Sequence, residues 1–258
     1  MQSQLFSTMT CKFLSSRRFS ICFILILSLF ISCNTLEYDD KSETANDAMS
    51  GKNIKSLEEQ FSSSIRQQAN TASDVDYLTK EEKELFYYLN LARLEPKIFA
   101  QTFVANYNHN PGNTAGYAFT ERKQSLIDYL NTMEPLPALV PNETLFEYAD
   151  CFATESGIQG IVGHDRTLTS CPKDKGFAEC CAYTKTGDGI WHILQFLVDA
   201  GEGNSFLGHR RILLEIGKTS RENMCIYMGA AIRPHKTYGK VSVLDLWNEK
   251  SRKKYEGK

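Results

Sequence analysis

The chain has 258 residues, enough for one sizeable domain with extensions, and its 42% hydrophobic content is ordinary for a globular protein. The 29 basic and 31 acidic residues leave a net charge of −2, which excludes the strongly basic character typical of proteins that bind DNA or RNA. We therefore expect no nucleic-acid partner, and the composition does not indicate a protein with several membrane spans.

The first 33 residues have the pattern of an export signal. Three basic residues precede an apolar run over residues 19–31, and polar residues follow it. This run of about 13 residues is too short for a membrane-spanning helix, which needs ~20. Residues 29–33 resemble a lipoprotein signal in which Cys33 is acylated, although Phe30 stands where leucine is usual. We predict a signal peptide over residues 1–32 and a lipid anchor on Cys33; cleavage without lipid and an uncleaved anchor are the alternatives.

A polar segment over residues 33–76 separates the predicted anchor from the folded part. It is rich in Ser, Asp, Glu, Asn and Gln, and such a composition buries too little apolar surface to offset the entropy of ordering. We predict a flexible linker, with a transient helix near residues 54–65. The acidic patch from Glu37 to Asp40 is similar to surface-export signals of some Gram-negative lipoproteins, and an ordinary solvated linker is the alternative. The expected location is the cell envelope, with the lipid in the outer membrane or at the cell surface.

Residues 77–250 are predicted to form one folded domain, followed by a polar tail over residues 251–258. Its first helix begins after Thr79, which can form a capping box with Glu82. The helix is expected to end before Pro96, because the residue before a proline disfavours helical backbone angles.

Three further helices and two strands are expected after a long loop over residues 105–120. Asn142 is the expected N-cap of the second of these helices, and the third carries an apolar stripe at helical spacing. The strands are rich in β-forming residues, and the Gly, Pro, His and Lys between them suit a hairpin. The predicted helices are Glu121–Thr132, one from Glu143, and Gly189–Asp199, and the predicted strands are Met224–Ile232 and Lys240–Trp247. Helices followed by a sheet indicate an α+β fold.

Five cysteines remain once the predicted signal and anchor are set aside: Cys151, Cys171, Cys180, Cys181 and Cys225. In an exported protein they can form disulfides, and the odd number leaves at least one thiol unpaired or paired between chains. The preferred local pair is Cys171 with Cys180 or Cys181, which would close a short loop. Metal binding by these cysteines is not favoured, because no two of them have the CxxC spacing of zinc sites.

The chain contains four short motifs in order: Leu89–Arg93 with the pattern N-x-x-R, Gly163–Asp165 around a histidine, Ala178–Cys180 around a glutamate, and Gly208–Leu213 beginning G-H-R. Together they resemble the bacterial branch of the CAP superfamily, which comprises the cysteine-rich secretory, antigen 5 and pathogenesis-related 1 proteins. The resemblance covers about residues 77–247 and implies a three-layer α-β-α sandwich with a central, mainly antiparallel sheet. We expect structural roles for Asn90 and Arg93, with Arg93 paired to a carboxylate on a neighbouring element.

The resemblance also implies that His164, Glu179, Asp199 and His209 meet in one cleft. Asp199 stands where the family has a glutamate, and the asparagines expected beside Glu179 and in the last motif are missing. Such a cleft can bind a divalent metal such as zinc through His164 and His209, with Glu179 as a further candidate ligand. It can instead hold a general base, or form a buried polar network without any ligand.

No nucleophile is evident, because no serine lies in an elbow motif. Catalysis is therefore the less favoured role, and we predict an extracytoplasmic binding module for a peptide, lipid or glycan ligand. The alternatives are a metal-assisted or His/Glu-dependent hydrolase and an interaction protein with a vestigial cleft. Among the other histidines, His192 is expected on a solvated helix face, and His109 and His235 are expected in exposed loops.

Overall fold

The computed structural model describes residues 51–108, 116–173, 176–184, 188–199 and 207–257. The predicted signal peptide, Cys33, the acidic patch from Glu37 to Asp40 and His109 lie outside the described residues. No helix within the described ranges is both long enough and apolar enough to cross a membrane.

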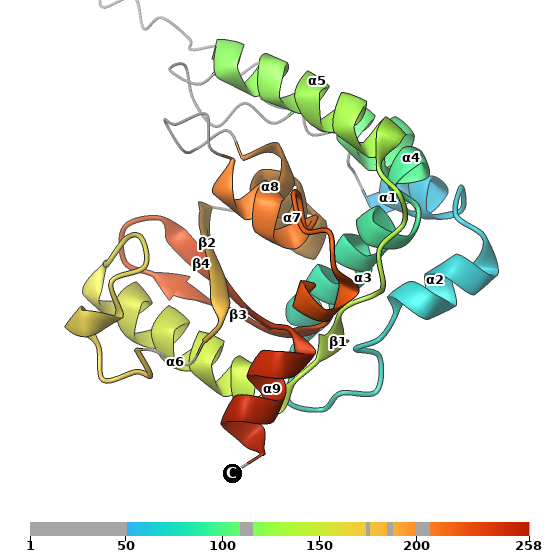
Figure 1. Ribbon diagram of the computed structural model, residues 1–258. Coiled ribbons are helices and arrows are strands. Elements are labelled where there is room, and N and C mark those ends of the chain that lie inside the picture. Colours follow the sequence, from blue (N-terminus) through green and yellow to red (C-terminus); the bar gives the residue numbers. More distant parts are fainter. Residues whose placement is uncertain (1–50, 109–115, 174–175, 185–187, 200–206, 258) are drawn as a thin grey trace, which may run out of the picture. The chain divides into compact units, whose positions relative to one another are not determined.

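Helices dominate the described chain, and the strands come mainly from its C-terminal third (Figure 1). The helices are α1 (Gly51–Glu58), α2 (Ser63–Ala69), α3 (Lys80–Leu94), α4 (Pro96–Phe99), α5 (Gly116–Thr132), α6 (Glu143–Gln159), α7 (Gly189–Val198), α8 (Gly208–Leu213) and α9 (Glu249–Glu256). Shorter helical turns are η3 (Ala100–Val104), η4 (Arg166–Leu168) and η5 (Arg221–Asn223). The strands are β1 (Val140–Pro141), β2 (Ala178–Thr184), β3 (Tyr227–His235) and β4 (Gly239–Trp247).

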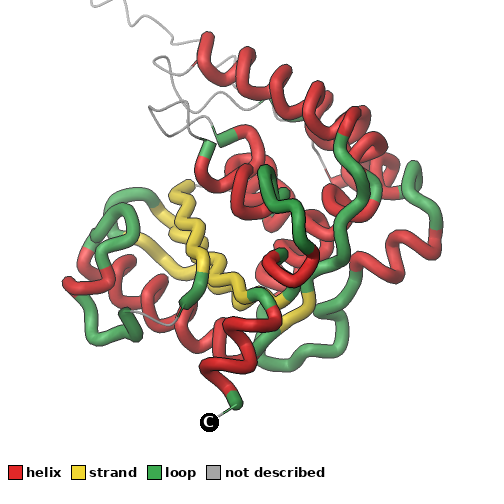
Figure 2. Tube along the Cα trace, in the orientation of Figure 1, coloured by secondary structure: helices red, strands yellow, loops and turns green. Residues whose placement is uncertain are grey.

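Among the described residues the sheet has the strand order β1-β3-β4-β2, and Figure 2 shows its strands in yellow. β3 and β4 form the predicted hairpin. β2 pairs antiparallel with the other edge of β4, which places Glu179 opposite Asp245, and the short β1 pairs parallel with β3. The protein is therefore a mixed α/β fold with a four-stranded mixed sheet. Sequence reasoning missed β2, because its seven residues contain no run of the β-branched residues that favour strands.

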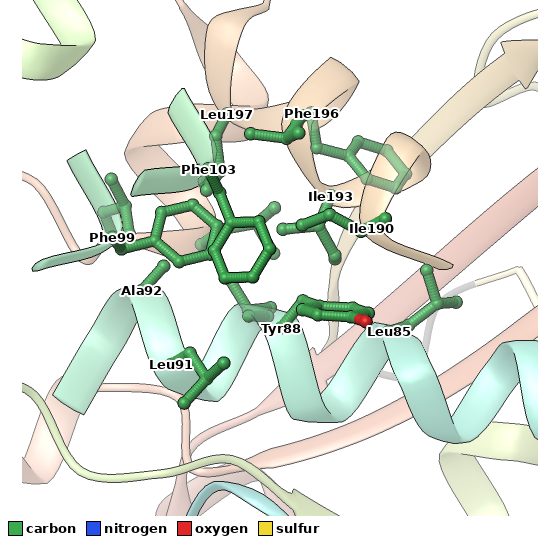
Figure 3. Close-up of a cluster of buried hydrophobic side chains, with 14 of the residues drawn as sticks. Leu85, Tyr88, Leu91, Ala92, Phe99, Phe103, Ile190, Ile193, Phe196 and Leu197 are labelled. Carbon is green, nitrogen blue, oxygen red and sulfur yellow. The ribbon is translucent and has the colours of Figure 1, made fainter. Parts of the chain in front are cut away.

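Helices pack against both faces of this sheet (Figure 1). α6 lies along β3 and β4 on one face, and α3, α7 and α8 lie on the other. Gly229 in β3 permits the close approach of α6, because a Cβ atom there would collide with the backbone of Leu145 and Phe146. On the second face, buried apolar side chains from α3, η3 and α7 interlock (Figure 3).

Two predicted helix starts are confirmed by individual hydrogen bonds. Thr79 Oγ1 accepts from the N–H of Glu82 at 3.3 Å, and the Glu82 carboxylate accepts from the N–H of Thr79 at 2.8 Å. Asn142 Oδ1 accepts from the N–H of Leu145 at 2.9 Å and caps α6. These contacts span three residues, so the local sequence is sufficient to determine them. The helix predicted from Glu121 begins earlier, as the bounds of α5 show.

The folded part begins earlier and ends later than the sequence predicts. Residues 51–76, predicted as linker, contain α1 and α2 and bury Phe61 in the core. Most of residues 251–258, predicted as a tail, belong to α9, where Tyr255 stacks on Trp247 with ring centroids 5.8 Å apart. A few apolar residues suffice to dock each segment on a core formed elsewhere, and average composition does not reveal this.

A disulfide joins Cys151 of α6 to Cys171 in the loop that follows. The predicted pairing of Cys171 with Cys180 or Cys181 is wrong; these two thiols and Cys225 are free and buried. The prediction assumed that closeness in sequence decides the pairing. The loop instead folds back along α6, which brings the two sulfur atoms together across a sequence separation of 20 residues.

Candidate functional site

Residues 160–168, here called the His164 loop, follow α6 and are anchored to the sheet. The phenol oxygen of Tyr183 in β2 accepts a hydrogen bond from the N–H of Gly163 at 2.9 Å. The Asp165 carboxylate accepts from the N–H of Thr167 at 2.9 Å and so caps η4. These contacts fix the backbone on both sides of His164.

His164 is oriented by a buried carboxylate. Its Nδ1 lies 2.8 Å from Oε1 of Glu179 in β2. An ionised carboxylate only accepts hydrogen bonds, so Nδ1 carries the hydrogen and donates it, and the lone pair of the ring is on Nε2. The His164 side chain is 51% exposed and the Glu179 side chain 8%. The pair therefore presents an imidazole of defined tautomer at the surface.

Arg166 lies beneath this pair and connects Glu179 to Asp245 of β4. Its Nε donates to Oε2 of Glu179 at 2.7 Å, and a terminal nitrogen donates to Oδ2 of Asp245 at 2.8 Å. The guanidinium lies between the rings of Phe152 and Phe177, 4.6 and 4.7 Å from their centres, which favours a cation. We call Arg166, Glu179 and Asp245 the Arg166 network.

The two carboxyl groups of the Arg166 network have opposite pKa shifts. Burial alone would raise the pKa of Glu179, but the hydrogen bond from His164 and the charge and hydrogen bonds of Arg166 outweigh burial and lower it. Burial raises the pKa of Asp245 well above its usual value, and the neighbouring Glu179 raises it further against the effect of Arg166. Glu179 is therefore the ionised partner of His164, and a proton on Asp245 allows it to donate to Glu179.

Asp199 and His209 form a second pair, at the junction of α7 and α8. His209 Nδ1 lies 2.9 Å from Oδ1 of Asp199, and the N–H of His209 donates to the other carboxylate oxygen at 3.2 Å. Asp199 is almost fully buried, and the His209 side chain is 12% exposed and packs edge-on against Phe196. This pair joins the end of α7 to α8, which is a structural role.

The four residues expected in one cleft are thus found as two separate pairs. Among the described residues, the group of potential metal ligands around His164 contains Glu179 and Cys181, with ligand atoms within 4.8 Å of one another, and it includes neither Asp199 nor His209. The nitrogen atoms of two histidines that share one zinc ion lie ~3.4 Å apart, and among the described residues His209 is not in the ligand group around His164. The metal site of His164 and His209 stays a prediction.

Cys181 is the third member of the group around His164. Its Sγ lies 3.6 Å from Nδ1 of His164, and Cys181 is 5% exposed. Burial, followed by the charges of Glu179 and Asp245, raises the pKa of this thiol well above its ordinary value, which disfavours a nucleophilic thiolate. Cys181 and Glu179 also approach the same ring nitrogen, whereas a nucleophile–histidine–carboxylate relay uses both nitrogens.

Asn90 and Arg93 of α3 are both fully buried and bind backbone groups. Asn90 Oδ1 accepts from the N–H of Leu139 at 2.7 Å, and its Nδ2 donates to the carbonyl of the same residue at 3.0 Å. Arg93 was expected to pair with a carboxylate, but its hydrogen bonds go to three backbone carbonyls at 2.7–3.0 Å. These contacts join α3 to segments far away in the sequence.

The predictions for two other histidines are wrong, because both are buried. His192 is inaccessible in α7, and its Nδ1 lies 2.9 Å from Oγ of Ser242 in β4. His235, at the end of β3, donates from Nε2 to the carbonyl of Ile161 at 3.0 Å and so supports the His164 loop. Helical periodicity misplaced His192, because α7 is covered both by the sheet and by other helices.

Sequence reasoning missed Arg166, Asp245 and Cys181, the three side chains that complete the surroundings of His164 and Glu179. Cys181 could have been inferred, because residues two apart in a strand share a face. The place of Asp245 in the site could not have been inferred, because it depends on the pairing of β2 with β4.

Compared with known proteins, this chain matches no family model, no curated protein and no solved structure.

Proposed function

We propose that this chain is an exported, lipid-anchored protein of the CAP superfamily whose domain, a three-layer α-β-α sandwich, binds a ligand at the cell envelope. The signal-like residues up to Cys33 support the anchor in the outer membrane or at the cell surface, and the four sequence motifs support the family. Helices on both faces of a mainly antiparallel sheet support the sandwich.

One observation carries the binding role: buried charged groups hold a single, half-exposed imidazole in one orientation. Glu179 bonds Nδ1 of His164, and Arg166 fixes the Glu179 carboxylate from behind. Burying such charges is costly unless they are paired, and the pairing here stiffens a side chain at the surface. A recognition group that is already ordered loses less entropy when it binds.

The surroundings of His164 indicate the kind of ligand. Val162 and Leu168, in the same loop, are 54% and 57% exposed, although their side chains are large and apolar. Exposed apolar groups beside an oriented polar group suit an amphiphile with an apolar chain and an anionic or hydrogen-bonding head. Such chemistry occurs in a lipid and in an apolar peptide, and it favours both over a glycan. Catalysis has weaker support, because Cys181 is buried and lacks relay geometry.

The binding role is tested with the full chain held in amphipol and three labelled probes: a long-chain fatty acid, an apolar peptide with a free carboxylate, and chitotetraose. We expect saturable binding of one of the first two, weakened at least about tenfold by His164→Ala. Gln159→Ala is the matched control, because Gln159 is exposed at the end of α6 beside the loop. Equal binding by wild type and His164→Ala, or binding of chitotetraose alone, would refute the proposed site.

The anchor is tested separately by metabolic labelling with an alkyne analogue of palmitate. We expect label in the full chain and none in Cys33→Ser, with the variant released from the membrane fraction. Equal labelling of the two proteins would refute lipidation at Cys33.

A further inference from the structure

Three atoms suited to zinc meet beneath the His164 loop. Glu179 and Cys181 are two residues apart in β2, so their side chains lie on the same face of the sheet, and His164 approaches them from the loop. The three ligand atoms lie within 4.8 Å of one another. An imidazole nitrogen, a carboxylate oxygen and a thiolate sulfur are all established ligand types for zinc.

The separation of the nitrogen and sulfur atoms agrees with tetrahedral coordination. Zn–N and Zn–S bonds of about 2.1 and 2.3 Å at tetrahedral angles place nitrogen and sulfur ~3.6 Å apart. The observed separation of His164 Nδ1 and Cys181 Sγ is 3.6 Å. Nitrogen and oxygen ligands would lie ~3.4 Å apart, so Glu179 Oε1, now 2.8 Å from Nδ1, has to move away by about 0.6 Å.

We propose that the chain binds one zinc ion through His164 Nδ1, a carboxylate oxygen of Glu179 and the thiolate of Cys181. Binding releases the Sγ proton to solvent and transfers the ring proton of His164 from Nδ1 to Nε2, so the ligands are a thiolate and a neutral imidazole. Three protein ligands leave a fourth position for water or for an anionic group of an external molecule.

The Arg166 network supplies the outer support that such a site needs. Arg166 Nε holds Oε2 of Glu179 at 2.7 Å, which leaves Oε1 as the oxygen directed at His164. The Cys181 thiolate and the Glu179 carboxylate supply two negative charges to offset those of Zn²⁺, and Asp245 holds Arg166 in place from the other side at 2.8 Å.

This site differs from the one that the resemblance implied, because Cys181 takes the place of His209. The other group of potential ligands in the described chain contains Cys151, Glu155 and Cys171. Its two cysteines form the disulfide and offer no thiolate. The inference deepens the proposed function, since both use His164, but its test needs no organic ligand and can fail or succeed independently.

The test is a titration of the full chain, stripped with a chelator, with Co²⁺ and then Zn²⁺. We expect one equivalent of cobalt, a near-ultraviolet thiolate-to-cobalt charge-transfer band, and loss of the band when zinc displaces cobalt. Cys181→Ala should abolish the band. Cys180→Ala is the matched control, since Cys180 is the adjacent buried thiol and belongs to the apolar cluster on the opposite face of the sheet.

Two further variants keep the test decisive. His164→Ala changes a half-exposed side chain and should fold even where Cys181→Ala does not; we expect metal affinity to fall at least about tenfold. His209→Ala should leave the affinity unchanged. Absence of the band in wild type, its persistence in Cys181→Ala, or its loss in His209→Ala would overturn the proposal. Amphiphile binding by the metal-free protein would then still support the proposed function.

Discussion

Replacing Arg166 with methionine should expose how much the surroundings of His164 depend on one buried cation. Methionine keeps an apolar stem of similar length but removes the guanidinium. The variant leaves Glu179 and Asp245 side by side without a counter-charge, and Phe152 and Phe177 lose the cation between their rings. Removing one partner from a buried ion pair costs about 3–5 kcal/mol. This is a large share of the about 5–15 kcal/mol by which a typical domain is stable.

The stability that Arg166→Met loses should depend on pH. In the wild type the pKa of Glu179 is lower in the folded than in the unfolded chain, so its contribution is present above the unfolded pKa and is lost as pH falls through the folded pKa. Without Arg166, burial and mutual repulsion raise the pKa of both carboxyl groups. The folded variant then holds protons that the unfolded chain has released, and its stability falls as pH rises through the raised values.

The assay is urea unfolding followed by circular dichroism at about pH 5 and pH 8, chosen because the deficit of the variant should be larger at the higher pH. Arg252→Met is the matched control, since Arg252 makes its ion pairs with Glu249 and Glu256 at the surface and should matter little. A loss that is equal at both pH values, or no greater than that of Arg252→Met, would refute the reasoning.

Three other changes test contacts away from the site. Arg93→Met leaves three buried carbonyls without their donor and should lower the free energy of unfolding by about 4 kcal/mol or more; a loss under ~1 kcal/mol in urea would contradict this. Cys151→Ala removes the disulfide to Cys171 and should cost about 3 kcal/mol, as should reduction of the wild type; unequal effects would argue against that pairing. Burial lowers the pKa of His192 to about 4, so the wild type should lose up to about 3 kcal/mol as pH falls from ~6.5 to ~4. His192→Gln should flatten that part of the curve, and an unchanged curve would exclude His192 as its cause.

The features that could be predicted from the sequence are those decided within a few residues. The capping contacts of Thr79 and Asn142 each span three positions, and the hairpin of β3 and β4 joins neighbouring segments. Such contacts form in whatever tertiary setting the segment finds itself. The hydrogen bond between His164 and Glu179 is a different case. The sequence motifs point to both residues, but they do not show that the two side chains bond to each other.

The wrong predictions share one cause, which is that burial depends on what packs against a segment from elsewhere. Helical spacing predicts a solvated face for His192, yet its side chain is inaccessible and bonds Ser242 of β4. Residues 51–76 read as a linker by composition, yet Phe61 is buried against the domain. Closeness in sequence favours Cys180 or Cys181 as the partner of Cys171, yet the disulfide joins Cys171 to Cys151.

The local sequence predicts the capped starts of α3 and α6 and the hairpin of β3 and β4. Tertiary packing places His164 and His209 in different pairs and brings Arg166, Asp245 and Cys181 to His164. Local propensity acts through bonds between near neighbours in the chain. The composition of a site instead follows from strand register and helix docking, which bring together residues separated by up to 79 positions, as in the bond from Arg166 to Asp245.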